Sequence, residues 1–223
     1  MITNKLIAEF IGTLFLVAAA LLGGGFAAAA TLCLCIYAMG HISGGHYNPA
    51  VSLGVFLRGK MSQRELIEYG CAQFAGAVAA WLVWRIIHGP GPDKVEGFGD
   101  NYGRAILGEF LGTFLLVTTV LHVATTKALA NNQFYGAAIG LAVIGGGAIA
   151  KFSGGALNPA VALGIVCSGG ASFGDFFAYL LGCFGGGAVA AIVFRIMLPG
   201  EHTPAVTASA NPNPPLPPSS NDP

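Results

Sequence analysis

Apolar positions along the chain gather into long runs that are separated by short polar or glycine-rich breaks. An α-helix rises about 1.5 Å per residue, so about 20 apolar residues cross the roughly 30 Å hydrocarbon core of a bilayer. Six runs have about that length, and they cover residues 5–24, 26–43, 65–88, 104–126, 133–151 and 174–198. The pattern predicts six transmembrane helices.

Two further apolar segments are about half as long. Each begins in a glycine-rich phrase, "GGHYNPAVSLG" at Gly44–Gly54 and "GGALNPAVALG" at Gly154–Gly164. Ten helical residues measure about 15 Å, which is half the thickness of the hydrocarbon core. We predict re-entrant half-helices over residues 48–57 and 158–168, each of which enters and leaves the membrane on one side.

The similarity between the two halves of the chain extends beyond these motifs. "AEFIGTLFLV" at Ala8–Val17 matches "GEFLGTFLLV" at Gly108–Val117. Each half carries three spans, an odd number, so the second half must be inverted relative to the first. We predict a first repeat with an outer linker over residues 1–101 and a second repeat over residues 102–198. Inverted repeats place their binding or conduction site near the bilayer midplane, at the repeat interface.

Composition agrees with a polytopic membrane protein. The mean hydropathy is +0.70, and 9% of residues are charged, against about 25% in soluble domains. Ten basic and ten acidic residues balance, which gives no reason to expect a nucleic-acid partner. The five cysteines lie in apolar segments without C-x-x-C pairs, so neither a disulfide framework nor a metal site is predicted. The proline-rich residues 199–223 are predicted to form a disordered tail.

The basic residues suggest an orientation. With both termini cytoplasmic, the inner side receives six Lys and Arg residues and the outer side four, in the sense of the positive-inside rule. The inner set is Lys5, Arg58, Lys60, Arg64, Lys127 and Arg195, and the outer set is Arg85, Lys94, Arg104 and Lys151. We therefore predict a multi-pass protein of the plasma or cytoplasmic membrane.

The repeated Asn-Pro pair has a direct structural meaning. Asn is a preferred N-cap, and Pro suits the first helical position, where its missing N–H is not needed. Asn48 and Asn158 should therefore begin the two half-helices. The glycines before them allow an extended backbone, which is tolerated at membrane depth where it lines a water-filled cavity. The backbone carbonyls expected to line such a cavity belong to Gly44, Gly45, His46, Gly154 and Gly155.

Inverted symmetry brings the N-termini of the two half-helices together at mid-membrane. Each carries about half a positive elementary charge. The Asn side-chain oxygens can cap the helices, which leaves the amide NH₂ groups as donors toward the cavity. A cation would be repelled there, whereas a neutral molecule with an acceptor oxygen would be bound. The arrangement favours small uncharged solutes.

The two Asn-Pro-Ala motifs, "HISGGHYNPAV" at His41–Val51 and the paired glutamates resemble the aquaporin (major intrinsic protein) family, from Leu6 to Leu198. The resemblance implies an all-α fold with six transmembrane helices and two re-entrant half-helices in an inverted 3+3 repeat. It also implies a homotetramer with one pore per protomer and no cofactor. The implied central constriction consists of Asn48, Pro49, Ala50, Asn158, Pro159 and Ala160.

Glu9 and Glu109 occupy matching places on the first and fourth spans. Ionisable residues inside a membrane are costly and usually functional. One hypothesis is a proton relay. The favoured one is that each carboxylate braces a re-entrant loop by accepting its N–H groups. His46 would line the inner half of the pore, either as a passive or packing residue or as a pH-dependent gate. Neither His46 nor His41 has the neighbours of a metal site.

The outer filter departs from the family pattern. Members usually carry an aromatic residue, often a histidine, and an arginine directly after the second Asn-Pro-Ala motif. Here Val161 stands at the arginine position, and counting from the motifs assigns Ala28, Gly146 and Gly155 to the other three positions. We predict a wide, apolar filter that passes water with glycerol, urea, ammonia or hydrogen peroxide, with protons excluded by the half-helices. Phe26, Phe152 or Lys151 could narrow or charge the mouth.

Other functions remain open at this stage. Glycerol-type members carry an acidic residue after the arginine, and Ala162 stands there, so a dedicated glycerol channel is not supported. A secondary transporter also uses inverted repeats, but it should show coupling-ion carboxylates and room for rocking. A closed structural membrane protein is a third possibility. No nucleophile–base constellation suggests an enzyme.

Overall fold

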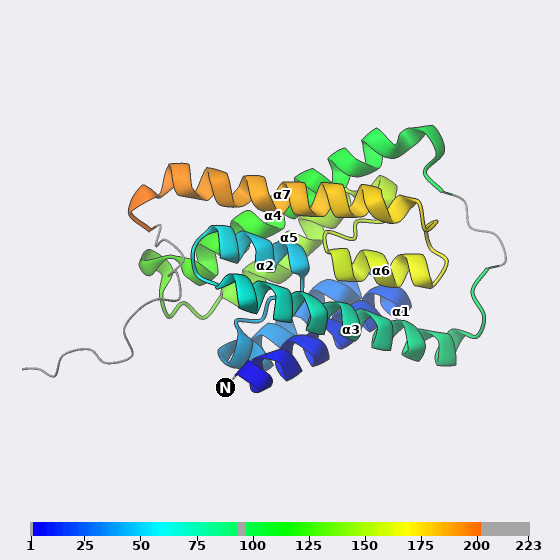
Figure 1. Cartoon of the computed structure of the whole chain (residues 1–223), viewed down its shortest axis with the longest axis horizontal. Helices are drawn as coiled ribbons and strands as arrows, with labels where there is room; N and C mark the ends of the chain where they lie inside the picture. The colour runs from blue at the N-terminus through cyan, green and yellow to red at the C-terminus, as the bar shows by residue number, and fades with distance from the viewer. Residues whose placement is uncertain (1, 93–96, 202–223) are drawn as a thin grey trace, which may run out of the picture.

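The computed structural model describes residues 2–92 and 97–201, and the regular secondary structure within them is helical. The α-helices are α1 (Ile2–Ser43), α2 (Pro49–Leu57), α3 (Gln63–His88), α4 (Tyr102–Thr125), α5 (Tyr135–Ile149), α6 (Pro159–Cys167) and α7 (Asp175–Met197). Short 3-10 turns lie at Gly99–Asn101, Lys127–Leu129, Lys151–Ser153 and Pro199–Glu201. Figure 1 shows the long helices side by side, with the short helices α2 and α6 between them.

Helix α1 contains the first two predicted spans, because it breaks at Gly24. The backbone there has φ 74° and ψ −170°, which is not helical. A Cβ built on Gly24 would meet nothing within 4 Å, so the positive φ itself is the reason for a glycine. Beyond the break the chain returns, since the Ser43 hydroxyl donates to Glu9 Oε1 at 2.6 Å. The two arms of α1 correspond to the predicted spans 5–24 and 26–43.

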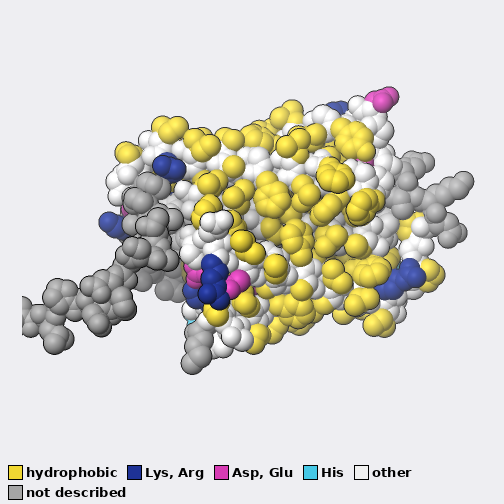
Figure 2. Space-filling model, in the orientation of Figure 1, with side chains coloured by type: hydrophobic (Ala, Val, Ile, Leu, Met, Phe, Trp, Pro, Cys, Tyr) yellow, Lys and Arg dark blue, Asp and Glu magenta, His cyan; other side chains and the backbone are white. Residues whose placement is uncertain are grey.

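The helices provide the length and surface that a bilayer requires. By length and hydropathy, α1, α3, α7 and the segment Gly99–Thr125 can each cross a membrane. Helix α5 is apolar but has only 15 residues, shorter than the predicted span 133–151, because its C-terminal end continues as a 3-10 turn. Figure 2 shows hydrophobic side chains over the middle of the visible face and charged side chains toward its two ends.

Glycines set how closely the long helices approach. A Cβ on Gly76 of α3 would lie 2.6 Å from the Phe10 carbonyl oxygen of α1. A Cβ on Gly186 of α7 would likewise lie too close to the Phe110 carbonyl oxygen of α4. Small residues of this kind permit close packing of membrane helices. The α1–α3 pair of the first half therefore matches the α4–α7 pair of the second.

The described ends of the chain lie at the same end of the molecule (Figure 1), which we call the terminal end. There the 3-10 turn Pro199–Glu201 is held in place. Glu201 accepts from the Nη2 of the fully buried Arg58 at 3.3 Å and from the Lys127 N–H at 2.9 Å. The predicted disordered tail therefore does not begin at Pro199. Its remaining residues, 202–223, lie outside the described part of the chain.

Candidate functional site

Asn48 and Asn158 cap the two short helices. Both have extended backbone with φ −157°, and a proline follows each at the start of the helix. The Asn48 Oδ1 accepts from the Ala50 N–H at 2.8 Å, and the Asn158 Oδ1 accepts from the Ala160 N–H at 2.9 Å. The Asn-Pro pairs thus begin helices as the sequence predicts, and α2 and α6 lie over the expected half-helix ranges.

The two asparagines also join the halves. Asn48 Nδ2 donates to the Leu157 carbonyl oxygen at 2.9 Å, and Asn158 Nδ2 donates to the Tyr47 carbonyl oxygen at 2.9 Å. Tyr47 and Leu157 have positive φ of 49° and 52°. A left-handed conformation costs an ordinary residue about 1–2 kcal/mol. One N–H of each amide is therefore used between the loops, and one remains for the cavity.

Glu9 and Glu109 are fully buried and accept hydrogen bonds from the loops that precede the short helices. Glu9 accepts from the Ser43 hydroxyl at 2.6 Å, the His46 N–H at 3.0 Å and the Tyr47 N–H at 2.7 Å. Gln73 Nε2 also donates to it, at 2.8 Å.

Glu109 repeats this pattern in the second half. It accepts from the Ser153 hydroxyl at 2.6 Å, the Ala156 N–H at 2.9 Å and the Leu157 N–H at 2.7 Å. Its fourth partner is the Cys183 thiol at 3.5 Å. Every partner of both carboxylates is a donor, which is the bonding that the brace hypothesis requires.

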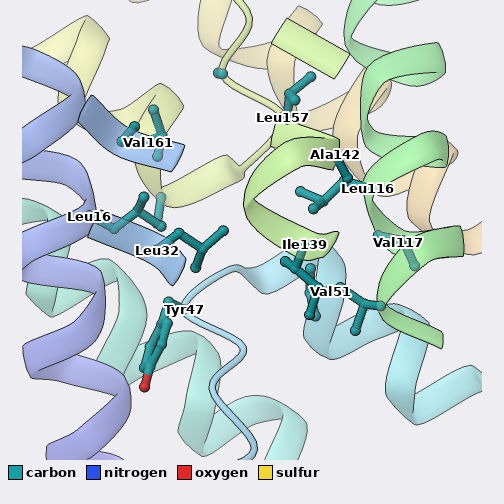
Figure 3. Close-up of a cluster of buried hydrophobic side chains, with 14 of the residues drawn as sticks. Leu16, Leu32, Tyr47, Val51, Leu116, Val117, Ile139, Ala142, Leu157 and Val161 are labelled. Carbon is teal, nitrogen blue, oxygen red and sulfur yellow. The ribbon is translucent and has the colours of Figure 1, made fainter. Parts of the chain in front are cut away.

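A cavity of about 400 Å³ runs past both asparagines. Its wall is mainly apolar, and Figure 3 shows Leu16 and Leu32 of α1 on one side with Leu116 of α4 and Ile139 of α5 on the other. The predicted residues that line it are Phe26, Ala28, Gly45, His46, Asn48, Lys151, Gly154, Gly155, Asn158 and Val161. The short helices, the loops and the break in α1 therefore share one cavity.

Several predicted residues do not line the cavity. Gly146 packs against α4, where a Cβ would lie 2.8 Å from the Gly112 carbonyl oxygen, and Gly147 lines the wall instead. The assignment of Gly146 to the filter wall is wrong because counting from the motif does not show how α5 is rotated. Phe152 packs on Phe98 and beneath the Arg104 guanidinium rather than in the wall.

The other residues outside the wall belong to the motifs. Pro49, Ala50, Pro159 and Ala160 are buried and do not line the cavity, and Gly44 is exposed and does not line it either.

Sequence reasoning missed several residues that shape the site. Ser43 and Ser153 each donate to a brace carboxylate, and the repeated "SGG" before both motifs is the signal that could have found them. Ser52 and Gln73 also join the polar network next to the cavity. Within residues 2–92 and 97–201, no group of three His, Cys, Asp or Glu side chains is placed to hold a metal ion.

Comparison with known proteins identifies one family. A family model described as "Major intrinsic protein" matches residues 1–194. The chain is 33% identical to aquaporin NIP1-4 of Oryza sativa subsp. japonica, over 90% of this chain and 79% of that one. It is also 33% identical to aquaporin AqpM of Methanothermobacter thermautotrophicus, over 88% of this chain and 98% of that one.

A solved structure has the same fold. The X-ray structure of the aquaglyceroporin from Plasmodium falciparum superposes with a TM-score of 0.71 at 19% identity, covering 90% of this chain and 99% of that one. With the family match over most of the chain, the chain belongs to the major intrinsic protein (aquaporin) family of membrane channels.

Proposed function

We propose that the protein is a passive channel for water and small neutral solutes such as glycerol, urea, ammonia or hydrogen peroxide. The observation that carries this proposal is the single cavity to which both Asn48 and Asn158 contribute, at the N-termini of two short helices. One amide N–H of each asparagine is available to an acceptor oxygen in that cavity. The helix N-termini oppose cations and protons there.

The cavity wall supports a broad choice of neutral solutes. Ala28, Gly155 and Val161 present small or apolar groups at the predicted filter, and none of them carries a charge. A solute therefore meets few donors before it reaches the asparagines. We expect passage of molecules larger and less polar than water, in a homotetramer with one pore per protomer.

The test compares wild-type protein with Val161→Arg in proteoliposomes, with stopped-flow light scattering for water, glycerol and urea. Arginine at this place should lower glycerol and urea flux by about tenfold, a barrier raised by about 1.4 kcal/mol. Water flux should fall less, because a single file of water can pass a narrow, donor-rich mouth. Val161→Leu, which adds bulk without charge, is the matched control.

Two outcomes would contradict the proposal. Equal losses of water and solute flux in Val161→Arg would reject the wide apolar filter. Wild-type flux that saturates with solute concentration and depends on an ion gradient would indicate a carrier instead of a channel.

A further inference from the structure

A chain of buried polar groups leads from the cavity wall to Glu9. His46 lines the cavity, and its ring Nδ1 lies 3.0 Å from Ser52 Oγ of α2. The same Oγ lies 3.1 Å from Gln73 Nε2 of α3. Gln73 Nε2 in turn lies 2.8 Å from Glu9 Oε2 of α1. The Ser52, Gln73 and Glu9 side chains are all fully buried.

The direction of these hydrogen bonds can be assigned from Glu9. Its partners are a hydroxyl, two backbone N–H groups and Gln73, so the carboxylate acts only as an acceptor. Gln73 must therefore present its NH₂ group, because its Oε1 would repel the carboxylate. The second hydrogen of that NH₂ group points to Ser52 Oγ. Gln73 Oε1 has no hydrogen-bond partner among the described residues.

The hydrogen bond that Ser52 accepts also decides which nitrogen of His46 is protonated. Its Oγ accepts from Gln73, so its own single hydrogen is available for another acceptor. Within the described chain, the only other hydrogen-bond partner of Ser52 Oγ is His46 Nδ1. Nδ1 therefore accepts, and the ring proton lies on Nε2. His46 is neutral in this arrangement.

The second half of the chain has no such relay. The positions that match His46, Ser52 and Gln73 at the repeat spacing are Ala156, Ala162 and Cys183. Cys183 still donates to Glu109, so the brace does not need a glutamine. The three relay side chains therefore occur in the first half only, and the loop of the second half is held without them.

We propose that Ser52 and Gln73 are positioning residues that hold His46 as the neutral Nε2–H tautomer, which fixes a hydrogen-bond donor in the wall of the pore on its terminal side. The proposal deepens the proposed channel function and rests on it, since a donor in the wall matters only if solutes pass it. An acceptor oxygen on water or on a neutral solute would bind this N–H before it reaches Asn48. The opposite half of the pore, with Ala156 at the matching place, lacks this donor.

Protonation of His46 is opposed by the relay. A second proton on Nδ1 would make Ser52 accept from both neighbours and would lose the hydroxyl-to-imidazole bond. The charged groups that act electrostatically on the ring are Glu9 and Lys5 of α1 and Glu65 of α3. The Tyr69 ring of α3 packs edge-on, with its centroid 5.3 Å from that of the His46 ring. The carboxylates favour the imidazolium, but Glu65 is paired with Lys5 at 3.0 Å and Glu9 is occupied by four donors. We expect solute flux to be independent of pH across the range in which free histidine titrates.

The first test reads the tautomer directly and does not depend on transport. Wild-type protein with ¹⁵N-labelled histidine in lipid is compared with His46→Gln by solid-state NMR, so that the difference spectrum belongs to His46. The expected result is an unprotonated Nδ1 and a protonated Nε2, unchanged between about pH 8 and about pH 5. An Nδ1–H tautomer, or an imidazolium at neutral pH, would overturn the proposal.

The second test is the pH profile of solute flux in proteoliposomes. Wild-type and Ser52→Thr, which keeps the hydroxyl, should change by less than about twofold between about pH 8 and about pH 5. Ser52→Ala should change by about threefold or more, because His46 without its donor can take the second proton. The double variant Ser52→Ala with His46→Gln should be flat again.

A flat profile for folded Ser52→Ala would reject the positioning role. If Ser52→Ala does not fold, the wild-type NMR result alone decides. Absence of solute flux in wild-type liposomes would reject the channel proposal and leave the tautomer to be judged by NMR.

Discussion

Glu9 and Glu109 hold the two loops whose backbone turns at Tyr47 and Leu157. Both residues have a left-handed backbone conformation, and the carbonyl oxygen of each accepts a hydrogen bond from the asparagine of the other half. The conformation is sustained because the N–H of the same residue donates to the carboxylate, at 2.7 Å in both halves. At the scale of single residues, each carboxylate therefore bonds the residue whose carbonyl oxygen accepts from the asparagine of the other half.

Removal of either carboxylate should destabilise the fold. Glu9→Ala leaves several buried donors without an acceptor, and each unsatisfied group costs about 1–3 kcal/mol, so we expect a total loss of about 3 kcal/mol or more. Glu109→Ala should cost less, because its fourth donor is the weak thiol of Cys183 at 3.5 Å. The apparent unfolding temperature in detergent measures both. An unchanged temperature with faster proton leakage would support the proton-relay hypothesis instead.

The sequence predicts some of these residues and not others, for a physical reason. Asn48 and Asn158 are predictable because capping depends on local backbone, and a proline follows each of them. Gly146 was misplaced because only the rotation of α5 against Gly112 decides which side of that helix faces the cavity. Ser52 and Gln73 belong to no recognisable motif. Their contacts exist only because α1, α2 and α3 come together in the fold.

At the scale of helices, the two halves pack through glycines at matching positions. Gly76 lets α3 approach the backbone of α1, and Gly186 lets α7 approach α4. The helix ends follow the predicted ranges within a few residues, because the apolar runs and the Asn-Pro pairs define them. The break at Gly24 falls where the sequence separates the predicted spans 5–24 and 26–43. The 3-10 turn after α5 is not predicted, since the run 133–151 extends past the end of that helix.

Two alanine substitutions on α3 test the role of these glycines. Gly76→Ala places a methyl group 2.6 Å from the Phe10 carbonyl oxygen, which belongs to a helix backbone and cannot move aside. We expect a loss of stability of about 1–3 kcal/mol, the usual cost of overpacking. Gly70→Ala is the control, because its Cβ would meet nothing within 4 Å. Equal unfolding temperatures for the two variants would show that the α1–α3 contact is not tight.

At the scale of the whole molecule, charge along the cavity is unevenly placed. The N-termini of α2 and α6 supply partial positive charge at the centre, where their caps bond across the interface. Among the lining residues Lys151 is the only Lys, Arg, Asp or Glu, and the sequence predicts it at the outer mouth. The ammonium group of Lys151 makes this mouth more positive than the other lining residues, which carry no such charge, would make it.

This charge should matter for cations and not for neutral solutes. Lys151→Met keeps the length of the side chain and removes its charge, so sodium or proton leakage into liposomes should rise while water flux stays unchanged. Lys151→Arg, which keeps the charge, should behave as wild-type. Because exposed charges are screened beyond about 8 Å at physiological ionic strength, the difference between Lys151→Met and wild-type should shrink as salt is added. If Lys151→Met excludes cations as well as wild-type at low salt, the half-helices alone provide the barrier and the lysine is a surface residue.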